Sequence, residues 1–101
     1  MMLNPRPAVM WFARRMEDVL RRNDYKGTWA ESTVEALLWK LHEEVAELHL
    51  AVLRGADTGT VVKEAVDVGN MAMMIADVAY QDMKQAQYNG EQESWAKNEW
   101  Q

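Results

Sequence analysis

The sequence of 101 residues contains no cysteine, and it has only two prolines, two histidines and one phenylalanine. Without cysteine, disulfide bonds, thiolate chemistry and cysteine-ligated zinc are excluded. No apolar run reaches the roughly 18 residues of a membrane span, because Asp67, Asn70 and Asp77 interrupt the best candidate. The first seven residues lack the apolar stretch of a signal peptide. We therefore expect a cytoplasmic protein with no membrane partner.

Apolar residues make up 49% of the chain and charged residues 27%, which is ordinary for a single folded domain. The formal net charge is −5, yet six of the eleven basic residues lie within residues 1–26. A net acidic chain is a poor candidate for binding nucleic acid, because that affinity comes mainly from neutralised phosphates. An acidic centre with a basic flank suits a metal ion together with a small anionic ligand.

Apolar residues recur at spacings of three and four, which is the period of an α-helix, and no segment alternates as a strand would. Asn4 followed by Pro5 predicts the start of a first helix, which ends near Asn23. The segment from Ser32 to Glu35 fits a capping box, with serine capping a second helix that runs to Arg54. A turn over residues 55–59 follows.

A third helix is predicted over residues 60–88, and Asn89-Gly90 is typical of a helix end. Residues 91–101 are expected to form a short C-terminal helix or tail. The predicted fold class is all-α, an antiparallel helical bundle within one domain of residues 1–101 whose core spans residues 8–90. Because the third helix is apolar on most sides, we expect a homodimer or homotetramer formed through pairs of helices.

Four acidic residues on the second and third predicted helices are the candidates for a metal site. Glu44 and Glu47 are three residues apart, as are Glu64 and Asp67, so each pair shares one helix face. In an antiparallel hairpin that turns near residues 55–56, Glu47 should face Glu64 and Glu44 should face Asp67. Four converging carboxylates repel each other unless a cation binds. All-oxygen ligands favour Mg²⁺ first and Mn²⁺ second.

The surroundings of these carboxylates resemble a known family. Glu44-x-x-Glu47, sixteen residues, and then Glu64-x-x-Asp67 is similar to the ExxE…ExxD signature of the all-α nucleoside triphosphate pyrophosphohydrolases. The chain most resembles the small MazG-like members, whose relatives include dCTP pyrophosphatases and dimeric dUTPases. The apolar context in residues 41–48 and 63–68 supports the resemblance, which covers about residues 8–90.

The resemblance implies cleavage of a nucleoside triphosphate between its α and β phosphates, giving a monophosphate and pyrophosphate. It also implies that Glu44, Glu47, Glu64 and Asp67 hold one or more Mg²⁺ ions. A carboxylate not committed to metal could accept a proton from the attacking water, and Glu43 and Glu47 are both candidates. Pyrimidine deoxynucleotides are the expected substrates, and clearing the nucleotide pool is the expected task.

Contacts to the phosphates are less determined. Lys40 lies four residues before Glu44 and can bind phosphate or form an ion pair with that carboxylate, the ion pair being favoured. Asn70 can bind a sugar or phosphate, or satisfy backbone groups in the bundle. Lys84 partly fills the place of a basic cluster in relatives, although acidic residues follow it, so Arg14, Arg15 or a partner subunit could substitute.

For the base, the resemblance favours Trp29 in the loop before the second helix, since aromatic rings stack on nucleobases; Trp11 and Trp39 are alternatives. Tryptophans in helices are also common in cores and interfaces. Two other functions remain open. One is a non-enzymatic helical interaction module with a structural divalent ion or none, and the other is a phosphoribosyl-ATP pyrophosphohydrolase.

Overall fold

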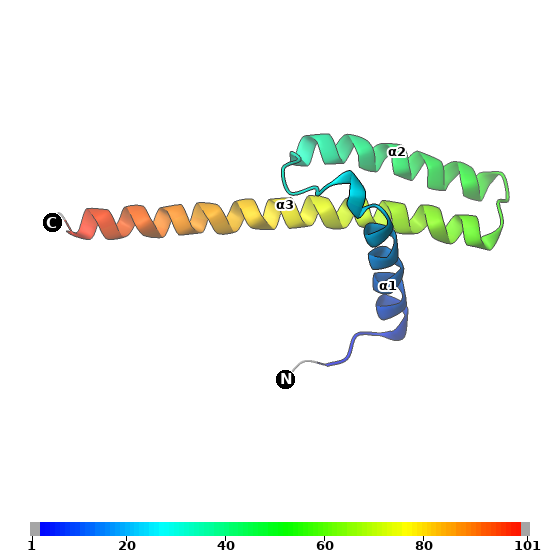
Figure 1. Cartoon of the computed structure of the whole chain (residues 1–101), viewed down its shortest axis with the longest axis horizontal. Coiled ribbons are helices and arrows are strands. Elements are labelled where there is room, and N and C mark those ends of the chain that lie inside the picture. The colour runs from blue at the N-terminus through cyan, green and yellow to red at the C-terminus, as the bar shows by residue number, and fades with distance from the viewer. Residues whose placement is uncertain (1–2, 100–101) are drawn as a thin grey trace.

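The computed structural model describes residues 3–99, with side chains described for residues 3–90. These residues form α1 (Pro7–Arg22), the short 3-10 helix η1 (Asp24–Lys26), α2 (Val34–Leu53) and α3 (Thr58–Glu99), and no strand occurs among them. The all-α fold class is confirmed. α2 lies antiparallel beside the first half of α3, whereas α1 crosses α3 (Figure 1).

The chain by itself is far from spherical. α3 continues well beyond the end of α2 without a neighbour (Figure 1). The radius of gyration is 18.8 Å, against about 13 Å for a compact domain of this length. Within the described residues, the buried apolar residues are only Leu37, Ala51, Val66 and Val78, and Val66 is the most completely buried of them. One chain therefore forms a helical hairpin with a crossing helix, and the hydrophobic core is small.

Both predicted helix starts need correction by a few residues. α1 begins at Pro7 rather than beside Asn4, because the residue before a proline is driven out of the helical region, and Arg6 is extended with ψ 146°. The N-cap of α2 is Thr33 rather than Ser32. The Thr33 hydroxyl accepts a hydrogen bond from the backbone N–H of Ala36 at 3.1 Å. The capping box predicted from Ser32 to Glu35 is therefore wrong by one residue.

The predicted helix end at Asn89-Gly90 is also wrong, because α3 continues to Glu99 without a break. A helix-ending glycine adopts a positive φ, and in the described chain only Gly27 and Gly55 do so. The side chain of Asn89 accepts a hydrogen bond from Gln85 one turn earlier, at 3.1 Å. One internal glycine costs a helix only about 1 kcal/mol. Residues 91–99 therefore extend α3, and residues 100–101 lie outside the described chain.

The length of α3, 42 residues, does not make it a membrane span. None of the described helices combines the length and the apolar character that crossing a membrane requires.

α1 packs closely on α3 at Gly69. A Cβ atom added there would lie 2.6 Å from the Phe12 ring, so glycine is what allows the two helices to approach. One residue further along, the Asn70 side chain donates a hydrogen bond to the Met16 carbonyl oxygen at 3.3 Å. Asn70 is 3% exposed, and it is the one buried polar residue among those described. This contact fixes where α1 crosses α3.

We expect Gly69→Ala to destabilise the fold by about 1 kcal/mol or more, because overpacking at Phe12 outweighs the gain in helix propensity. Gly90→Ala is the matched control, since no atom lies within 4 Å of a Cβ at Gly90. It should raise helix content without loss of stability. Urea unfolding followed by circular dichroism measures both. Equal stability of the two variants would mean that Phe12 moves aside freely.

Candidate functional site

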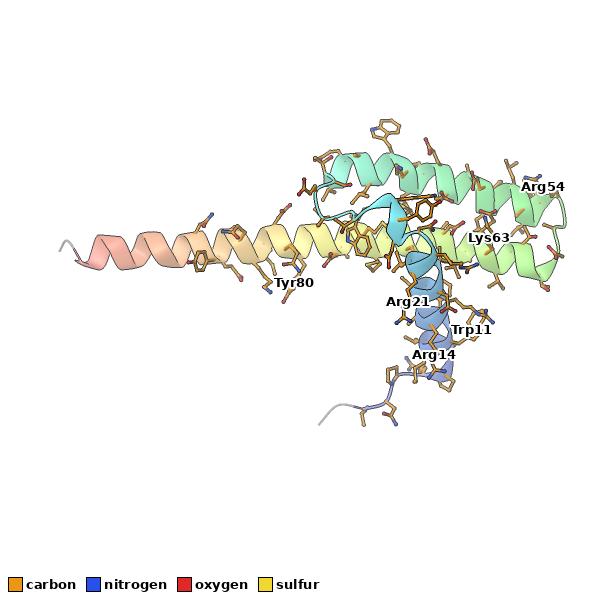
Figure 2. The ribbon with its side chains drawn as sticks, viewed as in Figure 1. Trp11, Arg14, Arg21, Arg54, Lys63 and Tyr80 are labelled. Carbon is orange, nitrogen blue, oxygen red and sulfur yellow. The ribbon has the colours of Figure 1, made fainter. Side chains whose placement is uncertain are left out.

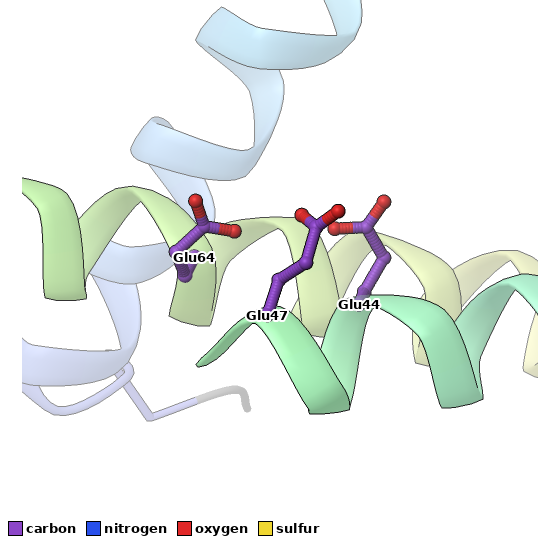
Figure 3. A group of neighbouring side chains, drawn as sticks. All are labelled: Glu44, Glu47 and Glu64. Atoms are coloured by element: carbon purple, nitrogen blue, oxygen red, sulfur yellow. The ribbon is translucent and has the colours of Figure 1, made fainter. Parts of the chain in front are cut away.

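The α2–α3 hairpin brings three of the four predicted carboxylates together. Glu44 and Glu47 come from α2 and Glu64 from α3, and one carboxylate oxygen from each lies within 4.8 Å of the others. Figure 3 shows the three carboxylates directed to the same side of the hairpin. The predicted antiparallel register is responsible, since it places Glu64 opposite the two α2 residues.

Two of these carboxylates have oxygen atoms that are buried and lack a hydrogen-bond partner, namely Oε2 of Glu44 and Oε2 of Glu64. Burial raises the pKa of Glu44, and the negative charges of Glu47, Asp67 and Glu64 raise it further. The Glu64 side chain is only 14% exposed. A group of partly buried, mutually repelling oxygens is under-neutralised, which is the electrostatic condition for binding a cation.

Asp67 lies beside this cluster but outside the group of three, and it forms an ion pair with Lys63. The Lys63 ammonium lies 3.3 Å from an Asp67 oxygen and 3.4 Å from a Glu64 oxygen. Asp67 is the larger cause of the raised pKa of Lys63. Lys63 therefore carries a positive charge next to the carboxylates and offsets part of their repulsion.

Three adjoining cavities lie where α1 and η1 meet the hairpin. The tryptophan cavity, about 340 Å³, is lined by Trp29 and Lys40. The carboxylate cavity, about 280 Å³, is lined by Glu44, Asp67 and Asn70. The basic cavity, about 380 Å³, is lined by Arg22, Lys63 and Asp67. Asn23 and Lys26 line all three cavities, so these are compartments of one depression.

Trp29, Lys40 and Asn70 are the predicted substrate contacts that line this depression. The Trp29 indole N–H donates a hydrogen bond to an Asp77 carboxylate oxygen at 3.0 Å, which ties the loop before α2 to α3. Trp39 is exposed and lines none of the three cavities, and the same holds for Trp11. The favoured Lys40–Glu44 ion pair is not formed. Among the described residues, the basic partners in ion pairs are only Arg21 and Lys63.

Two predicted site residues lie elsewhere. Glu43 is exposed on α2 and does not belong to the group of three carboxylates. Lys84 lies seventeen residues beyond Asp67 on α3, which is about 25 Å of helix. Its ammonium is 5.4 Å from the Tyr80 ring centroid. Within one chain, the structure therefore does not bring Lys84 to the carboxylates.

Four residues at the site were not predicted as site residues from the sequence: Lys63, Lys26, Arg22 and Asp77. Lys63 could have been found, because it precedes Asp67 by four residues on one helix face. The others have no comparable local signal. Lys26 and Arg22 reach the site because α1 crosses α3, and Asp77 matters because a loop folds back onto it.

The three carboxylates fit a hard divalent cation. Two ligands on opposite sides of an Mg²⁺ ion lie about 4 Å apart, and the oxygens of Glu44, Glu47 and Glu64 are within 4.8 Å of one another. The buried amide oxygen of Asn70, which lines the carboxylate cavity, also has no hydrogen-bond partner.

No family model, curated protein or solved structure matches this chain.

Glu44→Gln should stabilise the metal-free protein near pH 7.5. Because the pKa of Glu44 is raised on folding, its ionisation costs stability, so the wild-type protein should lose stability as pH rises through and above the ordinary glutamate range. The Glu44→Gln variant should lose less stability over the same rise in pH. Urea unfolding with chelator at pH 4.5 and 7.5 tests this. Glu43→Gln, at the exposed neighbouring position, should keep the wild-type pH dependence, and equal behaviour of both variants would contradict the assignment.

Proposed function

We propose that this chain is a Mg²⁺-dependent nucleoside triphosphate pyrophosphohydrolase of the MazG-like type, which hydrolyses its substrate to a monophosphate and pyrophosphate. The observation that supports the proposal most is the carboxylate group at the hairpin. Glu44, Glu47 and Glu64 lie together, and Glu44 and Glu64 each have a buried oxygen without a partner. The adjoining depression also holds Trp29 and several cationic side chains. Acidic and basic side chains that line the same adjoining cavities suit a metal–phosphate ligand.

In this proposal, Glu44, Glu64 and Asp67 hold the metal, and Glu47 both contributes to the metal site and accepts a proton from water. A bound Mg²⁺ supplies neutralisation of phosphate charge and a more acidic water. Glu47 suits the role of general base because it is exposed, whereas Glu44 and Glu64 have buried oxygens. Glu43 lies outside the group, so we favour Glu47 of the two candidates.

The tryptophan cavity suits the base and sugar. Its volume of about 340 Å³ is in the range of small-molecule sites. Trp29 offers a ring for stacking, and its hydrogen bond to Asp77 holds the ring in place. Met71 and Met74 complete an apolar wall. We propose pyrimidine deoxynucleotides as preferred substrates, and a nucleotide panel should include phosphoribosyl-ATP as the competing substrate class.

The test is pyrophosphate release from a panel of canonical and modified nucleoside triphosphates, with Mg²⁺ and with chelator. We expect release that requires Mg²⁺ and falls at least about 100-fold in Glu47→Gln, since loss of a general base typically costs that much. Glu43→Gln should retain activity if Glu47 is the base.

Glu35→Gln is the matched control, because it makes the same change at an exposed position in the first turn of α2. Its rate should equal that of the wild-type protein. No release from any substrate by folded protein would contradict the enzyme. It would favour the alternative of a helical interaction module, in which Glu44→Gln and Glu47→Gln are tolerated.

We also propose that the working form is a homodimer or homotetramer. Leu38, Val45 and Val52 recur every seven residues on one face of α2, and they are 44%, 45% and 57% exposed. This exposed apolar row and the small core of one chain both indicate that another surface covers α2.

Leu38→Glu should weaken self-association at least about tenfold, because a charge would be buried at the contact. Leu3→Glu is the matched control: Leu3 is exposed and lies before α1. Sedimentation velocity measures the mass against the 11.7 kDa of one chain. A wild-type protein that sediments as a monomer at high concentration would contradict the proposal.

A further inference from the structure

Three cationic side chains from three different elements line the basic cavity. Arg22 ends α1, Lys26 lies in η1, and Lys63 lies in the first turns of α3. The one carboxylate that lines this cavity is Asp67. In a chain of net charge −5, a cavity with three cations and one anion is a local reversal of sign.

Arg22 and Lys26 are not neutralised by ion pairs in the described part of the chain. The Arg22 Nε donates to the Asp18 carbonyl oxygen at 3.3 Å, which orients the guanidinium and leaves its terminal N–H groups available. The Lys26 ammonium lies 5.8 Å from the centroid of the Tyr25 ring, which is exposed. Both cations are therefore positioned but remain available to an anion.

The cations adjoin the carboxylates on one side and the tryptophan cavity on the other. Lys26 lines all three cavities. Lys63 lies within 3.4 Å of both Glu64 and Asp67, so it stands between the basic cavity and the carboxylate group. A ligand that fits both the cations and the adjoining carboxylates carries several negative charges along a short chain and a divalent cation at one side.

We propose that Arg22, Lys26 and Lys63 bind the phosphate chain of a divalent-metal polyphosphate, pyrophosphate or triphosphate. This deepens the proposed function and rests on it for the identity of the polyphosphate. The cations of α1, η1 and α3 thus perform the phosphate binding for which Lys40 and Lys84 were the candidates from the sequence. Guanidinium and ammonium groups bind phosphate by charge-assisted hydrogen bonds, which are the strong ones.

The test is calorimetric titration of the full chain with inorganic pyrophosphate and with tripolyphosphate, in Mg²⁺. Arg22→Gln combined with Lys26→Gln should weaken binding at least about tenfold, the equivalent of about 1.4 kcal/mol. Raising the salt concentration should weaken wild-type binding more steeply than binding by this variant, because exposed charges are screened. Both positions are exposed, so the variant should keep the helix content of the wild-type protein.

The matched control is Arg14→Gln combined with Arg15→Gln, which removes the same charge from α1 at positions that line none of the three cavities. Arg14 lies in the middle of α1, farther from the hairpin than Arg21 (Figure 2). The affinity of this control variant for either polyphosphate should stay within about twofold of the wild-type value, a difference of less than about 0.5 kcal/mol. If the double glutamine variant at Arg22 and Lys26 misfolds, Lys26→Gln alone makes the same test.

The outcomes separate this inference from the proposed function. Binding lost in the Arg22 and Lys26 variant but kept in the control supports the phosphate site, even if no nucleotide is hydrolysed. Hydrolysis by the wild-type protein with unchanged pyrophosphate affinity and KM in the variant leaves the enzyme standing and overturns the phosphate site.

Two further results would overturn the inference. One is no binding of either polyphosphate in Mg²⁺ at millimolar concentration. The other is a loss of binding in the control, or in Arg54→Gln, with none in the Arg22 and Lys26 variant. Arg54 lines a separate cavity of about 330 Å³ with Glu47 and Glu64 at the turn end of the hairpin, so it is the competing position.

Discussion

Like charges held at the contact between α2 and α3 are the constraint on which the rest of the structure depends. One carboxylate oxygen each from Glu44, Glu47 and Glu64 lies within 4.8 Å of the others, and an oxygen of Glu44 and one of Glu64 are buried without a partner. Apolar packing next to them keeps the hairpin closed, with Leu37 and Ala51 on α2 and Val66 on α3 buried. Lys63 relieves part of the repulsion. The closed hairpin therefore holds carboxylates whose negative charge is only partly neutralised, and this charge attracts a cation.

The site also depends on α1, which contributes no carboxylate to the cluster. Its position is set by the close approach at Gly69 and by the hydrogen bond from buried Asn70 to the Met16 carbonyl. These contacts place Asn23 and Lys26, which follow α1, over the hairpin where the three cavities meet. The basic N-terminal part of the chain is thereby brought against the acidic helices. Basic and acidic side chains that are separate in the sequence therefore line the same adjoining cavities.

The long α3 serves two regions of the molecule. Its first half carries Glu64, Asp67 and Asn70 and packs against both other helices. Its second half extends without a neighbour (Figure 1). Tyr80, Met83 and Tyr88 are exposed along that half, and apolar residues are exposed on α2 as well. Four buried apolar residues form a small core among the described residues 3–90, which is the physical basis for proposing self-association.

Local sequence was sufficient for much of the fold. The period of apolar residues determines that the chain is helical, and the turn near Gly55 determines the antiparallel register of α2 and α3. Because residues three apart share a helix face, the positions of Glu44, Glu47 and Glu64 also followed from spacing. Helix ends followed less well, since serine and threonine are both favoured N-caps, and local sequence does not choose between the neighbours Ser32 and Thr33.

Only the tertiary structure decided which cations join the carboxylates. Lys40 was expected to pair with Glu44 and instead lines the tryptophan cavity, while Lys84 lies far along α3. Arg22 and Lys26 belong to the site because α1 crosses α3 at Gly69, and a crossing depends on side-chain packing between segments far apart in the chain. Periodicity describes one helix at a time. The angle and depth at which two helices meet depend on pairs of residues that no local pattern relates.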